Sequence, residues 1–306
     1  MFHFKIIKVM ATNNNNGKSL NEKINDVMTS NMSSRMKQNE LVKLGLQPHE
    51  VYMMLHTKAW QTSGFDIAKL TFGIEIECYN FERADLISEA YSKGLNVRSE
   101  GYNHDDNQHY YKIVRDGSLV GENSQEVVSP ILNGERGLNS LKTLCSALDR
   151  VNAKVNRSCG LHVHIGAAAM TDEHYIRVFK NYQRLESVID TFMAFSRRDN
   201  NSRWCHSLQG FDFSTCRTKR DVARVLCYDR YHKVNAEAYS RHHTIEFRQH
   251  QGTTDYEKIS NWVRFLTKLV DYSFKHEVTS CNRIEDVPFL TDEEKQFFIR
   301  RRAALN

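Results

Sequence analysis

Hydrophobic and polar side chains alternate along three short segments of the chain, as they do in a β-strand with one buried face. In the last segment, which begins at Thr244, the residues Glu246, Arg248 and His250 share one face, and the apolar Ile245 and Phe247 share the other. A carboxylate, a guanidinium and an imidazole on one sheet face are costly to desolvate unless a metal, a phosphate or a counter-charge meets them. We expect the rest of the chain to be organised around this strand.

The same alternation occurs twice earlier in the chain. Glu75 and Glu77 alternate with isoleucine and cysteine, and His162 and His164 alternate with leucine, valine and isoleucine. Glu126, in a further predicted strand, is a fourth contributor. Any one of these pairs is typical of a solvated strand face or a hydrogen-bonded pair. Together they predict several strands whose polar side chains lie in phase on one face of a sheet.

Between the strands, apolar residues recur at the spacing of a helix. This pattern predicts helices over residues 82–93, 137–154 and 171–196, a short helix from 218, and two more from 254 and 291. Thr218 and Thr254 are each followed three residues later by an acidic residue, which predicts that each opens its helix with a capping box. Residues 95–115 are predicted to form two strands around the polar tip 103–107.

The N-terminal part of the chain has a different composition. Residues 11–34 are polar and include four consecutive asparagines, and such a stretch buries too little apolar surface to offset its ordering entropy. We expect a disordered or extended arm over residues 1–34. A short helical extension over residues 35–69 follows, in which Pro48 is predicted to open a second helix.

Composition narrows the class of protein without deciding it. The 306 residues suffice for one large domain or a domain with an appendage, and the net charge of +5 fits anionic small substrates as well as nucleic acid. Seven scattered cysteines without a Cys-x-x-Cys pair indicate reduced thiols and a cytoplasmic location, not a disulfide framework or a zinc ribbon. No apolar run has the length of a membrane span, so we expect no membrane partner.

Carboxylates and imidazoles gathered in this way predict a metal site. Several carboxylates with one imidazole suit magnesium, or manganese in its place, alongside substrate phosphates, whereas zinc sites use more imidazoles or thiolates. Arg248 follows Glu246 by two residues, and Arg230 and Lys233 lie a short way upstream. Such basic side chains can bind a nucleotide and stabilise a phosphoryl group in transfer. Because no glycine-rich phosphate loop occurs, a nucleotide would be held by metal and by side chains on the sheet.

The motifs, taken in their order along the chain, resemble the amidoligase family, which belongs with the carboxylate–amine ligases of the glutamine synthetase and guanidino kinase fold. They are Gly73-Ile-Glu-Ile-Glu77, Asp116-Gly-Ser118, Glu126-Val-Val-Ser-Pro130, Cys159-Gly-Leu-His-Val-His164, and Thr244-Ile-Glu-Phe-Arg248 followed by Gly252-Thr253. The resemblance covers residues 70–275, which would form the catalytic domain. Residues 276–306 would form a C-terminal helical tail.

The resemblance implies an α+β fold, with a curved antiparallel sheet, helices packed on one face, and ATP with two or more magnesium ions on the concave face. The residues that match the metal ligands of the family are Glu75, Glu77, Glu126, His162 and Glu246. Arg248 matches the arginine that contacts the transferred phosphoryl group, and His164 matches a nucleotide or structural contact. Catalysis would then depend on Arg248 and Glu246.

The function expected from this resemblance is ATP-dependent ligation of a carboxylate to an amine through an acyl phosphate. The carboxylate and the amine would belong to small molecules or peptides, and no motif indicates a nucleic-acid partner. Two alternatives remain open. A metal-dependent hydrolase could use His162-x-His164, although barrel-type hydrolases place this motif early in the chain, and here a Glu-x-Glu strand precedes it. A non-catalytic protein could retain the fold, although the complete set of charged residues argues against this.

Overall fold

The computed structural model describes residues 23–24, 26–27, 30, 32–46, 51, 70–101, 109–279 and 281–305. The chain divides into two compact units, residues 1–63 and residues 64–306. The longest described helix of the first unit is α2 (Ser34–Lys43), which begins where the Ser33 side chain accepts a hydrogen bond from the Met36 N–H. Most of the predicted arm, the predicted helix after Pro48 and the polar tip 103–107 lie outside the described residues.

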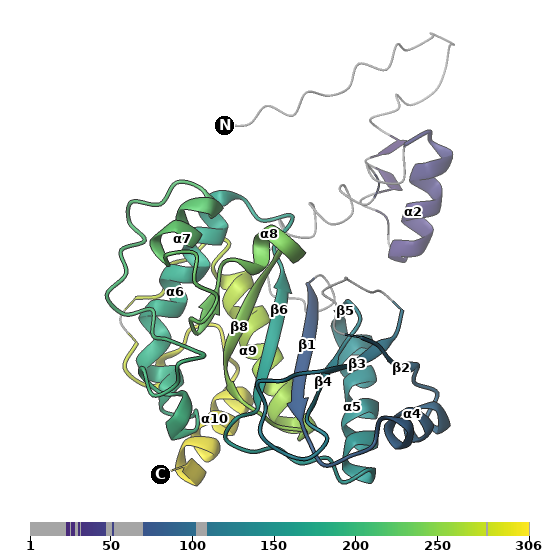
Figure 1. Ribbon diagram of the computed structural model, residues 1–306. Coiled ribbons are helices and arrows are strands. Elements are labelled where there is room, and N and C mark those ends of the chain that lie inside the picture. The colour runs from purple at the N-terminus through teal and green to yellow at the C-terminus, as the bar shows by residue number, and fades with distance from the viewer. Residues whose placement is uncertain are drawn as a thin grey trace. The chain divides into compact units, whose positions relative to one another are not determined.

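One sheet forms the centre of the second unit (Figure 1). Its eight described strands are β1 (Thr71–Cys78), β2 (Val97–Ser99), β3 (Tyr111–Arg115), β4 (Gln125–Val128), β5 (Leu132–Asn133), β6 (Gly160–Gly166), β7 (Val234–Asn235) and β8 (Thr244–Gln251). Strand β5 pairs with β1, and the other strands follow the order β2-β3-β4-β1-β6-β8-β7.

The described pairings are antiparallel except that of β2 with β3, which is parallel. The prediction of an antiparallel sheet therefore holds for the centre and is wrong at the β2 edge. Residues 100–110 separate the edge strand β2 from its neighbour β3. This connection is much longer than a two-residue hairpin turn, so its length does not force β3 to run antiparallel to β2.

The helical elements of the second unit are α4 (Arg83–Ser92), α5 (Gly134–Arg150), α6 (Asp172–Asp190), η2 (Phe195–Arg197), α7 (Lys219–Val225), α8 (Ala238–His242), α9 (Tyr256–Tyr272), η3 (Ile284–Asp286) and α10 (Asp292–Leu305). Figure 1 shows α5 and α9 behind the sheet, with α6 and α7 beyond its β8 side. The capping box at Thr218 is confirmed, but Asp255 caps α9 in place of Thr254. None of the described helices is both long and apolar enough to cross a bilayer.

The core lies between the sheet and the helices. Apolar residues of the three central strands are fully buried there, namely Ile74, Ile76, Leu161, Val163, Ile165, Ile245 and Phe247. The Phe247 ring packs against Tyr182 of α6, with 5.6 Å between ring centroids. Burying each large apolar side chain contributes about 1.5–3 kcal/mol. Because these residues alternate with the polar ones, their burial fixes which face of the sheet carries the polar side chains.

One irregularity interrupts this alternation in β8. Between the pairs Leu161–His250 and Val163–Phe247, β8 advances by three residues while β6 advances by two. This is a β-bulge, in which one extra residue is accommodated and the side chains beyond it change face. The strand pattern before the bulge is as predicted, and the pattern after it is reversed.

The bulge corrects the prediction that His250 shares a face with Glu246 and Arg248. His250 is buried on the helix side of the sheet, where its ring centroid lies 5.8 Å from that of Trp262 of α9. Its Nε2 lies 3.4 Å from a guanidinium nitrogen of Arg301 of α10. His250 is therefore part of the core, because a period of two cannot be extended across a bulge.

Candidate metal centre

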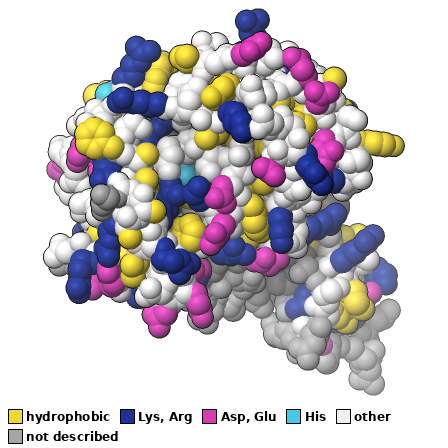
Figure 2. Space-filling view, turned by 90° about the horizontal axis from the view of Figure 1, so that it is seen from below, with side chains coloured by type: hydrophobic (Ala, Val, Ile, Leu, Met, Phe, Trp, Pro, Cys, Tyr) yellow, Lys and Arg dark blue, Asp and Glu magenta, His cyan; other side chains and the backbone are white. Residues whose placement is uncertain are grey.

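Three neighbouring strands bring the predicted polar residues together. Strand β1 pairs with β6 so that Glu75 lies opposite His162, and β6 pairs with β8 so that His164 lies opposite Glu246. The burial of the alternating apolar residues turns these four side chains to the other face of the sheet. Figure 2 looks at the molecule from below the view of Figure 1, and on this side basic and acidic side chains lie among hydrophobic ones.

His162 is at the centre of this cluster. Its Nδ1 lies 2.9 Å from Glu75 Oε2 and 3.7 Å from Glu246 Oε1, and its Nε2 lies 3.7 Å from Glu77 Oε1. Glu126 of β4 lies directly opposite Glu77 in the sheet. One buried imidazole ring is thus placed among carboxylates from three other strands, and the structure brings together all five residues predicted as metal ligands.

These residues form two overlapping sets of donor atoms. One set is Glu75, His162 and Glu246, and the other is Glu77, Glu126 and His162. Within each set, one donor atom from every residue lies within 4.8 Å of the others. His162 belongs to both sets. Carboxylate-rich donors with a single imidazole suit magnesium or manganese better than zinc.

The charges of the cluster favour a cation. Burial, followed by the charges of Glu75 and Glu77, raises the pKa of the Glu126 carboxyl well above its usual value. Burial also acts to raise the pKa of Glu75, but His164 and His162 outweigh it and hold that pKa well below the usual value. Carboxylates that repel one another in this way are stabilised by a divalent cation between them. The donor set therefore fits the metal that the sequence predicted.

Gly160, the first residue of β6, holds one of the carboxylates in place. Its backbone N–H donates a hydrogen bond to Glu77 Oε2. The glycine also leaves room at this end of the strand, because a side chain there would point at His162 and Glu77. The motif Cys-Gly-Leu-His was recognised in the sequence, but the sequence does not show that Gly160 contacts a carboxylate 83 residues earlier in the chain.

His164 lies at the opposite end of the cluster and belongs to neither donor set. Its Nδ1 lies 2.9 Å from Thr244 Oγ1, and its Nε2 lies 3.3 Å from Glu75 Oε1. Burial acts to lower the pKa of His164, but the Glu75 carboxylate outweighs it and raises that pKa. The role of His164 as a nucleotide or structural contact stays a prediction.

Arg248 is held beside the cluster by an ion pair. Its Nη1 donates to Glu246 Oε1, and the other oxygen of Glu246 accepts a hydrogen bond of 2.6 Å from Asn235 of β7. Burial acts to lower the pKa of Arg248, but Glu246 and Glu75 raise it, so the guanidinium stays charged. Asn235 was not predicted as a site residue, because a strand of two residues is too short to show a period in the sequence.

The structure does not bring Lys233 and Arg230 into the cluster. Lys233 is 0% exposed, and its Nζ lies 2.8 Å from both Glu186 Oε1 and Asp190 Oδ1 of α6. Its charge is therefore neutralised on the helix side of the sheet, which corrects the prediction that it contacts a nucleotide. Arg230 is exposed, and its guanidinium donates a hydrogen bond of 3.0 Å to the hydroxyl of Tyr231. Both lie near Arg248 in sequence, but Lys233 is turned to α6. Arg230 lies over the ring of Tyr231, 5.0 Å from its centroid, and the Arg248 guanidinium lies 5.9 Å from the same centroid.

Comparisons with known proteins agree with the order of the motifs. A sequence model of the family described as "Putative amidoligase enzyme" matches residues 68–270. No curated protein matches the chain. Among solved structures, one that matches is titled "Crystal structure of novel glutamine synthase homolog", with a TM-score of 0.34 and 9% sequence identity. The match covers 83% of this chain and 68% of that one.

Proposed function

The chain belongs to the amidoligase family, and from this membership we propose that it is an ATP-dependent carboxylate–amine ligase. The observation that supports the proposal best is the pair of donor sets that share His162 on one face of β1, β6 and β8. A carboxylate-rich centre with a buried arginine beside it is the arrangement that phosphoryl transfer from a magnesium-bound nucleotide requires.

The proposed reaction has two steps. A carboxylate oxygen of the first substrate attacks the γ-phosphorus of ATP, the bond from that phosphorus to the β,γ-bridging oxygen breaks, and ADP leaves. The amine nitrogen of the second substrate then attacks the carbon of the acyl phosphate. The carbon–oxygen bond to the phosphate breaks, inorganic phosphate leaves with that oxygen, and the nitrogen loses a proton to give an amide. Forming the acyl phosphate replaces a poor leaving group by a good one.

Magnesium, or manganese in its place, would be held by Glu75, Glu77, Glu126, His162 and Glu246. When bound, such ions neutralise the charge of the nucleotide phosphates. The chain's own contribution is to orient these ligands. Gly160 and Asn235 fix two of the carboxylates through hydrogen bonds from outside the donor sets.

Arg248 would stabilise the phosphoryl group during transfer. Its planar guanidinium is oriented by the Glu246 carboxylate and by the carbonyl oxygen of Trp204, 3.5 Å from Nε. A guanidinium fixed in this way can bind two phosphate oxygens at once, which an ammonium group cannot. His164, at the other end of the cluster, would contact the nucleotide.

The same proposal extends to the rest of the chain. The sheet would correspond to the curved sheet of the glutamine synthetase and guanidino kinase fold, with the site on its concave face. Residues 70–275 would form a cytoplasmic ligase domain with residues 276–306 as its helical tail. The hydrolase alternative is less well supported, because His164 Nδ1 lies within hydrogen-bond distance of Thr244 and His164 belongs to neither donor set among the described residues.

The reaction is tested by measuring ADP release from ATP in the presence of a panel of carboxylates and amines, with and without magnesium. We expect release that requires magnesium, a carboxylate and an amine together. The Arg248→Lys variant should retain ATP binding and lose turnover by roughly 100- to 1,000-fold, because its contact strengthens as the phosphoryl group moves. Glu246→Gln should bind metal more weakly, and excess magnesium should partly restore its turnover.

A purely structural ion pair between Glu246 and Arg248 predicts a different result. Both variants would then lose thermal stability, turnover per folded molecule would stay unchanged, and added magnesium would have no effect. That outcome would place the reaction elsewhere in the chain, so melting curves are recorded for each variant beside the turnover measurements.

A further inference from the structure

A pocket of about 490 Å³ lies beside the metal centre, and we propose that it binds a second anionic group, a carboxylate or a phosphate, of the carboxylate substrate. The inference rests on the proposed function, and it specifies the class of acid that the ligase would take. Its substrate would be a dicarboxylate or a phosphorylated acid, including an acidic residue of a peptide, and not a simple monocarboxylate.

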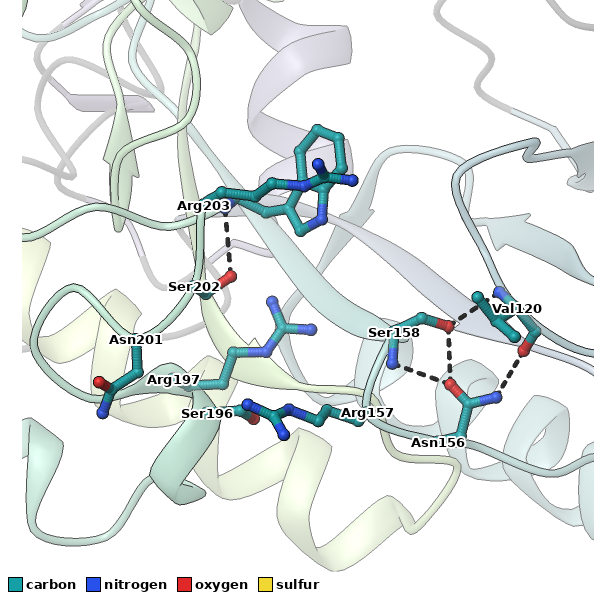
Figure 3. A pocket seen from close by; sticks show the side chains of 10 residues that line it. Val120, Asn156, Arg157, Ser158, Ser196, Arg197, Asn201, Ser202 and Arg203 are labelled. Carbon is teal, nitrogen blue, oxygen red and sulfur yellow. Dashed lines mark hydrogen bonds between the residues drawn. The ribbon is translucent and has the colours of Figure 1, made fainter.

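Three arginines line this pocket, namely Arg157, Arg197 and Arg203. They come from two loops, the one that precedes β6 and the one around η2 that continues to Trp204. Figure 3 shows the Arg197 guanidinium projecting into the space between Ser202 on one loop and Ser158 on the other. The hydroxyls of these two serines and of Ser196 also line the pocket.

The positive charge of the pocket is not neutralised by the protein. Among the described residues, no carboxylate lies within ion-pair distance of any of the three arginines. Arg197 is only 4% exposed, and the hydrogen bond found for its guanidinium goes to the neutral carbonyl oxygen of Cys159, at 2.6 Å. A buried guanidinium without a counter-ion is strongly unfavourable, so this charge calls for an anionic ligand.

Arg203 and Arg157 are available to such a ligand. Both are exposed, and Arg203 lies over the ring of Trp204, 4.5 Å from its centroid. The loop before β6 is fixed in part, because Ser158 Oγ accepts a hydrogen bond from the Val120 N–H and donates one to Asn156. The exposed guanidinium groups of Arg157 and Arg203 can adjust their positions to a ligand.

Hydrogen bonds link residues of the pocket to the metal centre in two places. Arg197 is bonded to the carbonyl of Cys159, and the next residue, Gly160, donates its N–H to Glu77 of the second donor set. On the other side, the carbonyl of Trp204 accepts from Arg248. An acid anchored in the pocket would thus direct its other carboxylate towards Glu77 and Arg248, where phosphorylation is proposed.

The place of the arginine pocket, at one end of the metal centre, favours the acid over the nucleotide as the ligand of the pocket. The pocket borders the Gly160 end of β6, whereas His164, the proposed nucleotide contact, lies towards the other end of the same strand. In-line transfer requires the acceptor and the leaving group on opposite sides of the transferred phosphoryl group. A nucleotide at the His164 end therefore leaves the arginine pocket to the acceptor.

The test is isothermal titration of the full chain in the presence of EDTA, so that binding reports on the pocket without the metal centre. The probes are glutarate with two carboxylates, 3-phosphonopropionate with a carboxylate and a phosphonate, and butyrate with a single carboxylate. We expect the two doubly anionic probes to bind more tightly than butyrate, and the tighter of the two identifies the preferred second group.

The variants compare pocket arginines with a matched surface arginine. The double variant Arg157→Gln, Arg203→Gln should bind the doubly anionic probes roughly 10- to 100-fold more weakly, since each charge-assisted hydrogen bond contributes strongly to affinity. Both positions are exposed, so the fold should be kept. Arg136→Gln, an exposed position on α5 outside the pocket, should bind like the wild type.

Equal or undetectable binding of all probes would overturn the proposal, and so would unchanged binding in the double variant. Competitive displacement of glutarate by magnesium–ATP, once magnesium is restored, would also overturn it, because that result would assign the pocket to the nucleotide. Failure of the ligase proposal looks different. In that case the arginine-dependent binding of glutarate persists, and no combination of acid, amine and magnesium gives ADP release.

Discussion

A single side chain added at Gly160 would enter the metal centre. A Cβ atom there would lie 2.9 Å from His162 Nε2 and 3.3 Å from Glu77 Oε2. Both residues belong to the donor set that Glu126 completes. Since the first of these distances is shorter than real Cβ contacts, the imidazole or the strand would have to shift, and the donor atoms would separate.

We therefore predict that Gly160→Ala weakens manganese binding by roughly 10- to 100-fold, the range found when groups that orient metal ligands are altered. The control is Gly73→Ala on β1, where the nearest atom to an added Cβ would be His164 Cβ at an ordinary 3.7 Å. Titration of manganese into both variants, followed by electron paramagnetic resonance, measures the difference. Equal affinities in the two variants would show that the donor set near Gly160 does not hold the metal.

At the scale of the elements, β8 connects the site to the helix layer. Lys233 O accepts the Arg248 N–H, while the Lys233 side chain is bound to α6. Gln249, the residue after Arg248, accepts a hydrogen bond from the hydroxyl of Tyr182 on α6 and donates one to the carbonyl of Arg197. Lys233 and Gln249 thus belong to a buried network that links the backbone of Arg248 to α6 and to the loop carrying Arg197.

The regular elements, and the donor sets with them, could be predicted from the sequence. Alternation in β1, β6 and β8 is determined by burial of one face, so Glu75, His162 and Glu246 were placed on one face correctly. His250 and Lys233 were not, because a bulge shifts the face and a buried partner on α6 captures the charge. Both effects depend on contacts between segments far apart in the chain, which local periodicity does not contain.

The arginine pocket, which is formed by loops, could not be predicted from local periodicity either. The segment after α6 is visibly rich in arginine and aromatic residues, and a solvated surface is the ordinary explanation for such a segment. In the fold, Arg197 of η2 is buried, donates to the carbonyl of Cys159 and lines the same pocket as Arg157, which lies 40 residues earlier in the chain. For the whole chain, the resemblance over residues 70–275 is confirmed by the family match over residues 68–270.

For the whole molecule, the burial of His174 should make the free energy of unfolding depend on pH. Burial lowers the pKa of His174 from 6.5 to about 4, with a hydrogen bond to the carbonyl of Val270 acting in the opposite direction and the charges of Arg177 and Lys219 adding to the shift. Between these two pH values the unfolded chain binds a proton that the folded chain does not. The contribution of His174 to the free energy of unfolding should therefore be fully present above pH 6.5 and be lost as the pH is lowered towards 4.

This group alone should remove up to about 3 kcal/mol over that window. Melting temperatures measured as a function of pH should fall less steeply for His174→Gln, which can still donate to Val270 but does not titrate. If the two proteins have parallel profiles, His174 is not among the groups that destabilise the fold in acid. Because His174 lies on α6 away from both donor sets, the comparison is independent of metal binding.

We expect the donor sets around His162 to bind a magnesium–nucleotide complex, and isothermal titration with ATP measures this binding. Wild-type protein should bind ATP with magnesium present and lose most of this affinity when magnesium is chelated. Glu77→Gln, which removes one carboxylate charge from the second donor set, should weaken the magnesium-dependent binding by roughly 10- to 100-fold. ATP affinity that is the same with magnesium, with EDTA and in Glu77→Gln would show that these donor sets do not bind the complex.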